Sequence, residues 1–320
     1  MTNTMSMRPA VRRYPITAGT CGLILGFIFA TPAAAGEPQF ELLTDVADDR
    51  RQVDILWRAP DDGDGPWPAI LFVHGFQPPE LETGFAPGAK AMLEEPPRYP
   101  LFEMFRSKGF LVGAVSQSGY GDTDGPLDFC GPLSQQAIAT GIAALRNHPD
   151  VRADQVFLHG RSRGAVASSM AATKPLGIAG VILESGVYDV KSEYANLLEK
   201  GTDPYIYIAA NIELEAGITD EAFIDRSILL TDRSIPAPVL VLHGGDDNNT
   251  PVVHAIRLED HLRARDADVQ LAIFPGEGHH VPPALTAPVI EEFIARALDG
   301  RHYVPGARQD DGARGTGGGN

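Results

Sequence analysis

Short, wholly apolar runs recur along the chain, and segments with helical spacing lie between several of them. The runs are Ala69–Val73, Phe110–Val115, Val156–Leu158, Val181–Leu183, Val239–Leu242 and Leu271–Phe274. Such runs are typical of strands that are covered on both faces of a sheet. Helical spacing marks Leu101–Lys108, Ser134–Asn147 and Val289–Leu298. Strands that alternate with helices predict an α/β fold, with a doubly wound, mostly parallel sheet and helices on both faces.

Two segments depart from this alternation. The segment Phe40–Arg58 predicts an antiparallel hairpin, whose second strand alternates apolar side chains at Val53, Ile55 and Trp57. Between Tyr188 and Ile235 the chain has helical patches and many acidic residues but no strand run. We predict a helical cap inserted at about 188–235. A solvated acidic decoration without contact to a substrate is the alternative.

The amino terminus has the composition of a targeting segment. Arg8, Arg12 and Arg13 precede an apolar run, Ile16–Ala30, that leads into several small residues. The run is shorter than the ~20 residues that span a bilayer. We therefore predict a signal peptide cleaved after Ala35, no stable membrane insertion afterwards, and a periplasmic or secreted location. An uncleaved membrane anchor is the alternative.

The remaining chain is predicted to be one domain, residues 36–300, followed by a disordered Gly-rich tail, residues 301–320. The chain has 320 residues, 43% of them hydrophobic, which is enough for one large core. A net charge of −16 argues against nucleic acid as a partner. Cys21 lies in the predicted signal peptide, so only Cys130 remains and core packing must hold the domain together.

One strand end carries a nucleophile motif. The run Val156–Leu158 leads into Gly160-Arg161-Ser162-Arg163-Gly164, and an Ala-rich segment with helical composition follows. In a G-x-S-x-G turn the glycines let the chain reverse tightly and expose the serine at the top of a sheet. Ser162 is the candidate nucleophile, and an ordinary strand-to-helix turn is the alternative. Cys130 has no such turn around it.

A serine hydroxyl needs a base to accept its proton, and the base needs an acid to orient it. Two further strand ends supply such residues, and the order serine, acid, histidine is the one used by doubly wound hydrolase sheets. The candidate acids are Asp246 and Asp247, with Glu184 and Asp189 as remoter ones, and the candidate bases are His279 and His280. The residues alone leave the choice within each neighbouring pair open.

The segment Arg226–Leu229 and the stretch Ile235–Gly244, followed by D-x-x-T-P and G-E-G-H, resemble the catalytic domain of the prolyl oligopeptidase family, with Thr250 in place of the family's usual valine. The resemblance runs from about Ala69 to Leu298. It implies an α/β-hydrolase fold and places the acid at Asp247 and the base at His279. The family's larger peptidases carry a β-propeller before this domain, and the stretch after the predicted cleavage site is too short for one. We therefore predict a hydrolase domain that lacks the propeller.

The oxyanion of an acyl-transfer reaction needs two hydrogen-bond donors. We predict the backbone N–H groups of Arg163, at a helix start, and of Phe76, after a strand end. Many peptidases of the family have H-G-G-P where this chain has H-G-F-Q. His74, Tyr120 and Arg161 are further candidates for the pocket. The two arginines either bind a substrate carboxylate or pair with acids of the cap.

These features predict a serine hydrolase that acts through an acyl-enzyme intermediate on a short peptide or a small ester. The family resemblance favours prolyl oligopeptidase-like peptide hydrolysis over carboxylesterase- or lipase-like ester hydrolysis. A non-catalytic binding protein on a hydrolase fold is the remoter alternative. No metal or organic cofactor is expected, because the nine histidines show no H-E-x-x-H or paired-ligand spacing. No pattern indicates an oligomeric state.

Overall fold

The computed structural model describes residues 38–78, 86–94 and 100–303, all within one compact unit, Ala33–Asn320. The predicted signal peptide and residues 304–320 of the predicted tail lie outside the described residues. Within the described ranges, no helix is both long enough and apolar enough to cross a membrane.

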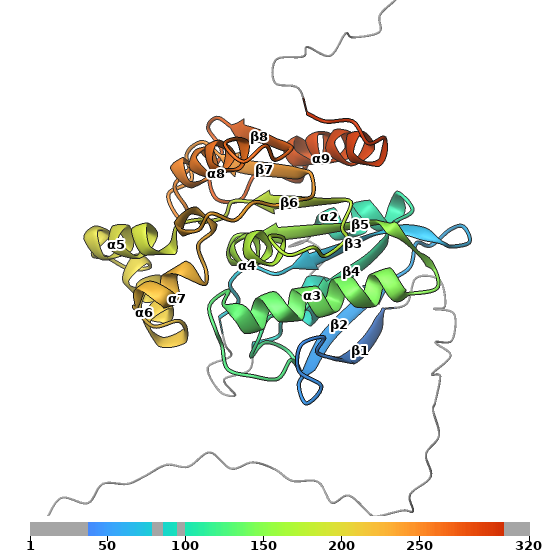
Figure 1. Ribbon diagram of the computed structural model, residues 1–320, viewed down its shortest axis with the longest axis horizontal. Helices are drawn as coiled ribbons and strands as arrows, with labels where there is room; N and C mark the ends of the chain where they lie inside the picture. Colours follow the sequence, from blue (N-terminus) through green and yellow to red (C-terminus); the bar gives the residue numbers. More distant parts are fainter. Residues whose placement is uncertain (1–37, 79–85, 95–99, 304–320) are drawn as a thin grey trace, which may run out of the picture. The chain divides into compact units, whose positions relative to one another are not determined.

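The described strands form one eight-stranded sheet in the order β1-β2-β4-β3-β5-β6-β7-β8 (Figure 1). The pairs β1–β2 and β2–β4 are antiparallel, and all other neighbours in this order are parallel. This confirms the predicted doubly wound, mostly parallel sheet. The strands are β1 Gln39–Thr44, β2 Gln52–Arg58, β3 Trp67–Val73, β4 Leu111–Val115, β5 Val151–Arg161, β6 Gly180–Glu184, β7 Val239–Gly244 and β8 Val269–Phe274.

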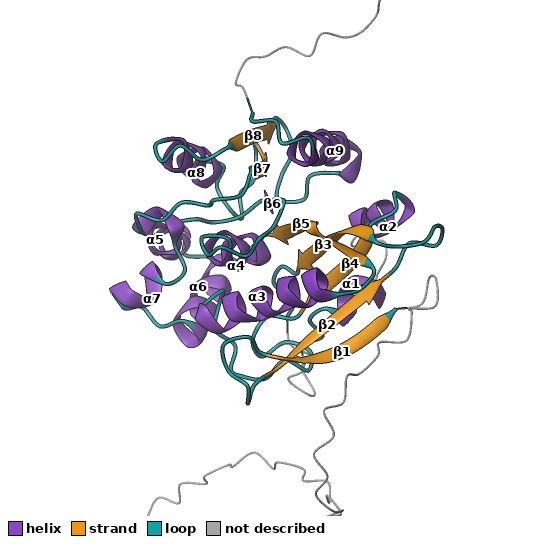
Figure 2. Ribbon diagram, turned by 45° about the vertical axis from the view of Figure 1, so that its right-hand side comes forward, coloured by secondary structure: helices purple, strands orange, loops and turns teal. Residues whose placement is uncertain are grey.

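Helices cover both faces of the sheet (Figure 2). The side with α3, α4 and α8 forms one hydrophobic cluster, and the side with α1, α2 and α9 forms the other. These helices are α1 Lys90–Glu94, α2 Pro100–Ser107, α3 Pro132–Asn147, α4 Arg163–Ala171, α8 Val253–Arg263 and α9 Pro283–Leu298. The hydrophobic pattern predicted α2, α3 and α9, whereas α1 and α8 were not predicted.

A separate group of helices lies between β6 and β7 in the sequence. Figure 1 shows them in yellow and gold, set apart from the helices that cover the sheet. They are α5 Val190–Lys200, α6 Tyr205–Glu215, α7 Asp220–Ile224 and the 3₁₀ helix η2 Ile228–Leu230. We call residues 188–235 the cap. As predicted, the cap contains helices and no strand.

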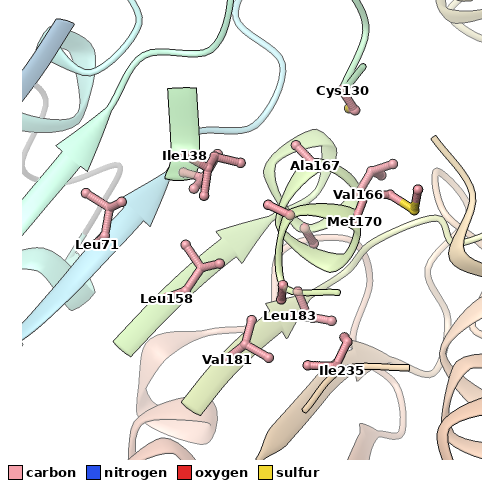
Figure 3. Packing of buried hydrophobic residues seen from close by; sticks show 14 of the residues in the cluster. Leu71, Cys130, Ile138, Leu158, Val166, Ala167, Met170, Val181, Leu183 and Ile235 are labelled. Carbon is pink, nitrogen blue, oxygen red and sulfur yellow. The ribbon is translucent and has the colours of Figure 1, made fainter. Parts of the chain in front are cut away.

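The core follows from the period of two along each strand, because successive side chains point to opposite faces. In Figure 3, Leu71, Leu158 and Val181 of three neighbouring strands lie on the side of Ile138 of α3 and of α4. The residues that precede or follow them in sequence join the other cluster; examples are Ile70, Phe157 and Ile182. The central part of each parallel strand is therefore apolar on both faces, which is why the apolar runs predicted these strands.

The structure confirms the predicted hairpin of β1 and β2 and places Val53, Ile55 and Trp57 in one cluster. Asp54 and Leu56 are buried like the three apolar residues that alternate with them. Leu56 packs in the cluster on the α2 side. Asp54 accepts a hydrogen bond of 2.9 Å from the hydroxyl of Ser116. Both faces of β2 are therefore covered, although only one face shows an apolar pattern.

A substitution of Phe293 in α9 tests the packing of the core on the α2 side. Its side chain is fully buried, and its ring packs edge-on against Phe157, with ring centroids 6.5 Å apart. We expect Phe293→Ala to lower the free energy of unfolding by about 3–5 kcal/mol, because it leaves a cavity. Leu298→Ala, on the exposed side of the same helix, should change it by less than about 0.5 kcal/mol. Urea denaturation measures both variants, and equal effects would contradict this packing.

Candidate active site

Ser162 lies on a strained turn between β5 and α4. Its φ of 52° and ψ of −122° fall in a region that residues with a side chain rarely adopt. A Cβ atom on Gly160 would lie 2.4 Å from the carbonyl oxygen of Gly164, and one on Gly164 would lie 2.2 Å from that of Val73. Both positions therefore require glycine. The N–H of Ser162 donates to the carbonyl of Glu184 at 2.8 Å, which holds the turn against β6.

His279 lies between Ser162 and Asp247. Its Nε2 is 2.9 Å from the Ser162 Oγ, and its Nδ1 is 2.9 Å from Oδ2 of Asp247. When Nδ1–H donates to the carboxylate, Nε2 is left to accept the serine proton. The loops after β5, β7 and β8 supply the three residues. The structure thus brings together the three side chains that the sequence selected as nucleophile, acid and base.

The Asp247 carboxylate is buried and held by several donors. Its Oδ1 accepts hydrogen bonds from the backbone N–H groups of Asn249 and Thr250, each at 2.9 Å, and its Oδ2 accepts one from the Thr250 hydroxyl at 2.7 Å. Burial by itself raises the pKa of Asp247, but hydrogen bonds from His243, His279 and Thr250 outweigh it and hold that pKa far below the usual range. Asp247 therefore stays ionised beside the histidine.

Thr250 was not predicted to have a role. It occupies the position of D-x-x-T-P at which the resembled family has valine, and its hydroxyl adds a hydrogen bond to Asp247 that valine would lack. The Thr250 Oγ1 also lies 3.1 Å from Nδ1 of His279. The replacement of valine by Thr250 was visible in the sequence. Its consequence, a hydrogen bond from the Thr250 hydroxyl to Asp247, is visible only in the structure.

The other candidate acids and the second histidine have different partners. Asp189 is the N-cap of α5, where it accepts from the N–H of Ser192, and Asp246 is exposed. Glu184 is buried, with one oxygen 3.3 Å from Nε2 of His159. His280 Nδ1 accepts a hydrogen bond from the Arg161 guanidinium. The carboxylate that meets the base is therefore Asp247.

A cavity of about 740 Å³ has Ser162 and His279 in its wall. The wall is mostly apolar, and the cap supplies much of it, including Leu197, Ile208 and Ile212. The cap therefore lines the same cavity as the candidate nucleophile, which is inconsistent with a decoration remote from the site. Polar lining residues are His159, Arg161, Arg163, Glu184, Glu193, Asn211, Asn249, Thr250 and His280.

His74 and Tyr120 do not line this cavity, in contrast to the prediction for them. Both are fully buried, and their rings are in contact, with centroids 4.7 Å apart. The Nδ1–H of His74 donates to the carbonyl of Gly75 at 2.8 Å, and its Nε2 accepts from the N–H of Gln117. Burial lowers the pKa of His74 to about 4, so the ring is neutral. His74 thus joins the loop after β3 to the loop after β4, which contains Gln117 and Tyr120.

The two backbone N–H groups that we predicted to bind the oxyanion belong to the loop after β3 and to the start of α4. The Gly75 backbone lies against the nucleophile, because a Cβ atom on Gly75 would be 3.4 Å from that of Ser162. Phe76 follows and lines the cavity. Arg163 is the first residue of α4, where a backbone N–H has no acceptor within the helix. Gly75 and Arg163 therefore both lie next to Ser162, and the donor role of the Phe76 and Arg163 N–H groups stays a prediction.

The Arg163 side chain pairs with the cap. Its guanidinium forms an ion pair with Glu215 of α6, and the two side chains are only 4% and 7% exposed. The guanidinium also lies 5.3 Å and 4.7 Å from the ring centroids of Tyr120 and Phe129. Burial by itself lowers the pKa of Arg163, but Tyr120, Cys130 and Glu215 outweigh it and raise that pKa. Of the two roles left open for Arg163, the structure shows the pairing with a cap acid.

Cys130 contacts the same helix start. It is buried and free, and its Sγ donates to the carbonyl of Arg163 at 3.1 Å. Burial is the main cause that raises the pKa of Cys130 to about 12. Its thiol therefore stays protonated, in agreement with its lack of a nucleophile motif. In the ranges that the structure describes, no group of three or more His, Cys, Asp or Glu is placed to hold a metal ion.

Glu215 was not predicted, because it lies 52 residues after its partner and no local pattern distinguishes it from other acids of the cap. We expect Glu215→Gln to lower the free energy of unfolding by about 3–5 kcal/mol, since it leaves a buried cation unpaired. Glu213→Gln removes an exposed acid of the same helix and should cost less than about 1 kcal/mol. Chemical denaturation measures the free energy of unfolding of both variants. Equal losses would contradict a larger contribution of the buried ion pair.

Comparisons with known proteins agree with this geometry. Residues 134–292 match the family model described as the prolyl oligopeptidase family. The chain is 26% identical over 190 residues to the uncharacterized peptidase YtmA of Bacillus subtilis, a match that covers 59% of this chain and 72% of that protein.

Two solved structures share the fold. An acylaminoacyl peptidase of Pyrococcus horikoshii has a TM-score of 0.62 at 19% identity, covering 84% of this chain and 43% of its own. An esterase of Pyrococcus furiosus has a TM-score of 0.60 at 16% identity, covering 82% of this chain and 91% of its own. The chain therefore spans less than half the length of the peptidase and most of the length of the esterase.

Proposed function

The chain is a serine hydrolase of the α/β-hydrolase fold, with a catalytic domain of the prolyl oligopeptidase type, and from this premise we propose that it hydrolyses short peptides through an acyl-enzyme intermediate. The observation that carries the proposal is the hydrogen-bonded line from Ser162 through His279 to Asp247 in the wall of a cavity. A binding protein on a hydrolase fold would not need this line, and that alternative is set aside.

In the proposed reaction the Ser162 Oγ attacks the scissile carbonyl carbon while Nε2 of His279 takes its proton. Asp247 stabilises the resulting imidazolium through Nδ1–H. The tetrahedral oxyanion accepts hydrogen bonds from the backbone N–H groups of Phe76 and Arg163. His279 then gives the proton to the departing nitrogen, the acyl group stays on Ser162, and a water activated by the same base releases it.

Three observations favour a short peptide as substrate. The matched family segment contains the serine turn, the cap, the acid and the base. The relative in Bacillus subtilis is named a peptidase. A volume of about 740 Å³ lies within the range of small-molecule sites, so a long chain would not fit inside the cavity. Carboxylic-ester hydrolysis is the second candidate, because the mostly apolar wall suits an ester and the same residues would perform it.

Labelling with a fluorophosphonate tests the nucleophile, because such a probe phosphonylates an activated serine. We expect the wild type to be labelled and Ser162→Ala not to be. Rates on aminoacyl anilides and on p-nitrophenyl esters then separate the two candidates. Absence of Ser162-dependent labelling would remove the proposal, and cleavage of esters alone would leave the second candidate.

Two neighbouring acids provide a matched test of the triad. Asp247→Asn should lower kcat by about 10⁴-fold, the loss that a wrong histidine tautomer causes in a serine–histidine–aspartate triad. Asp246→Asn changes an exposed residue and should keep kcat within about threefold. Steady-state rates on one substrate measure both. Full activity in Asp247→Asn would overturn the assignment of the acid.

We also propose that the protein is exported, on the strength of the arginines and the apolar run that precede Ala35. An exported hydrolase with one buried thiol does not depend on the redox state of its compartment. Amino-terminal sequencing of the protein recovered from its producing cells should give Gly36 as the first residue. A chain that retains the apolar run would contradict cleavage.

A further inference from the structure

Arg161 is a partly exposed cation in a mostly apolar cavity. It is the last residue of β5, directly before Ser162, and it lines the cavity. Its side chain is 24% exposed, against 4% for Arg163. One nitrogen donates to Nδ1 of His280, and Nε lies 3.6 Å from Glu184, which is too far for a hydrogen bond. Among the described residues no other group pairs with this guanidinium, so most of its N–H donors lack a protein acceptor.

The guanidinium lies on the histidine side of the nucleophile. It contacts His280, whose ring centroid is 5.1 Å from that of His279. In the proposed reaction Nε2 of His279 hands its proton to the leaving group, which must therefore come within hydrogen-bond distance of that atom. A substrate group next to Arg161 thus belongs to the departing half of the substrate.

His280 adds a second donor at the same place. Since its Nδ1 accepts from Arg161, the ring is the neutral tautomer with a proton on Nε2. Burial, with the adjacent Arg161 and His279, lowers the pKa of His280, which favours this neutral form. The pair therefore presents a planar guanidinium fork and an imidazole N–H. A carboxylate is the group whose two oxygens match that set of donors.

We propose that Arg161 and His280 form a subsite for a carboxylate carried by the leaving group. In a peptide this carboxylate is the free C-terminus, whose carbon lies about 2.5 Å from the scissile nitrogen across two backbone bonds. The preferred substrates are then short acylated peptides that lose their C-terminal residue as a free amino acid. The inference rests on the proposed function and names its substrate class.

A purely structural role for Arg161 is the competing explanation. Glu184 is only 3% exposed, and its nearest cations are Arg161 and, when protonated, His159. Burial by itself raises the pKa of Glu184, but contacts with His159 and Arg161 outweigh it and lower that pKa. If Arg161 served only to balance this carboxylate, its loss would change stability but not the choice between charged and neutral leaving groups.

The test compares two substrates that differ only in that charge, N-benzyloxycarbonyl-Gly-Phe and its C-terminal amide. Released phenylalanine or phenylalaninamide is quantified by chromatography, and the ratio of kcat/KM for acid over amide is the readout. We expect a ratio well above one in the wild type. Arg161→Gln should lower it about ten- to hundredfold, the worth of a hydrogen bond to a charged group. Arg161→Lys keeps the charge but not the planar fork, so its ratio should lie between those of the wild type and Arg161→Gln.

Arg152→Gln is the matched control, because Arg152 is an exposed arginine near the opposite end of the same strand. It should leave the ratio unchanged. Fluorophosphonate labelling of each variant shows that the serine turn is folded. A second pair of substrates tests the same preference with ester leaving groups. It consists of a 4-acyloxybenzoate, whose leaving group carries a free carboxylate, and the methyl ester of that compound, whose leaving group does not.

The outcomes separate the inference from the function on which it rests. A wild-type ratio near or below one, or an unchanged ratio in Arg161→Gln, overturns the carboxylate subsite while leaving a serine hydrolase. Absence of Ser162-dependent labelling and hydrolysis on every substrate overturns the proposed function itself. Cleavage of the ester pair alone, with the acid preferred and the preference lost in Arg161→Gln, overturns peptide hydrolysis and supports the subsite.

Discussion

The close approach of α4 to the end of β3 is the constraint on which the rest of the site depends. A side chain on Gly160 or Gly164 would collide with backbone atoms, so the tight turn between them requires glycine at both ends. In this turn Ser162 has a positive φ and lies just beyond the end of β5. The turn also sets the first N–H of α4 beside the serine. The nucleophile and the N–H group that we propose as oxyanion donor are thus placed by the same packing.

Arg163 connects this turn to the cap. Its backbone borders the reaction space, while its side chain forms the buried pair with Glu215 of α6. The N–H of Phe129 donates to the same carboxylate at 3.2 Å, so the loop before α3 joins the connection. A buried ion pair stabilises little by itself, but breaking it is costly because one charge is left without a partner. The pair therefore specifies where the cap sits relative to the machinery that it covers.

The sequence predicted features that depend on local pattern and missed those that depend on contacts between distant segments. Apolar runs predicted the parallel strands, because both faces of the central strands are covered, and the family resemblance selected Asp247 over Asp246. His74 and Tyr120 were misplaced because a strand end indicates which edge of the sheet a residue occupies but not whether its side chain points outward or beneath. Glu215 had no local signal, since its partner is fixed only when the cap folds.

Two adjacent strand ends repeat one arrangement of charge. After β7 the buried carboxylate of Asp247 holds His279, and at the end of β6 the buried carboxylate of Glu184 lies beside Arg161. The pKa of each acid is lowered despite its burial, because its neighbours donate to or attract the ionised form. Each carboxylate thereby keeps a cationic or basic group in the wall of the cavity. Arg161 and Glu184 are the last residues of their strands, whereas Asp247 and His279 lie on the loops that follow β7 and β8. One of these groups, His279, moves the proton in the proposed reaction. The other group, Arg161, is held in the same way by a buried carboxylate, and in the proposed subsite it selects the leaving group.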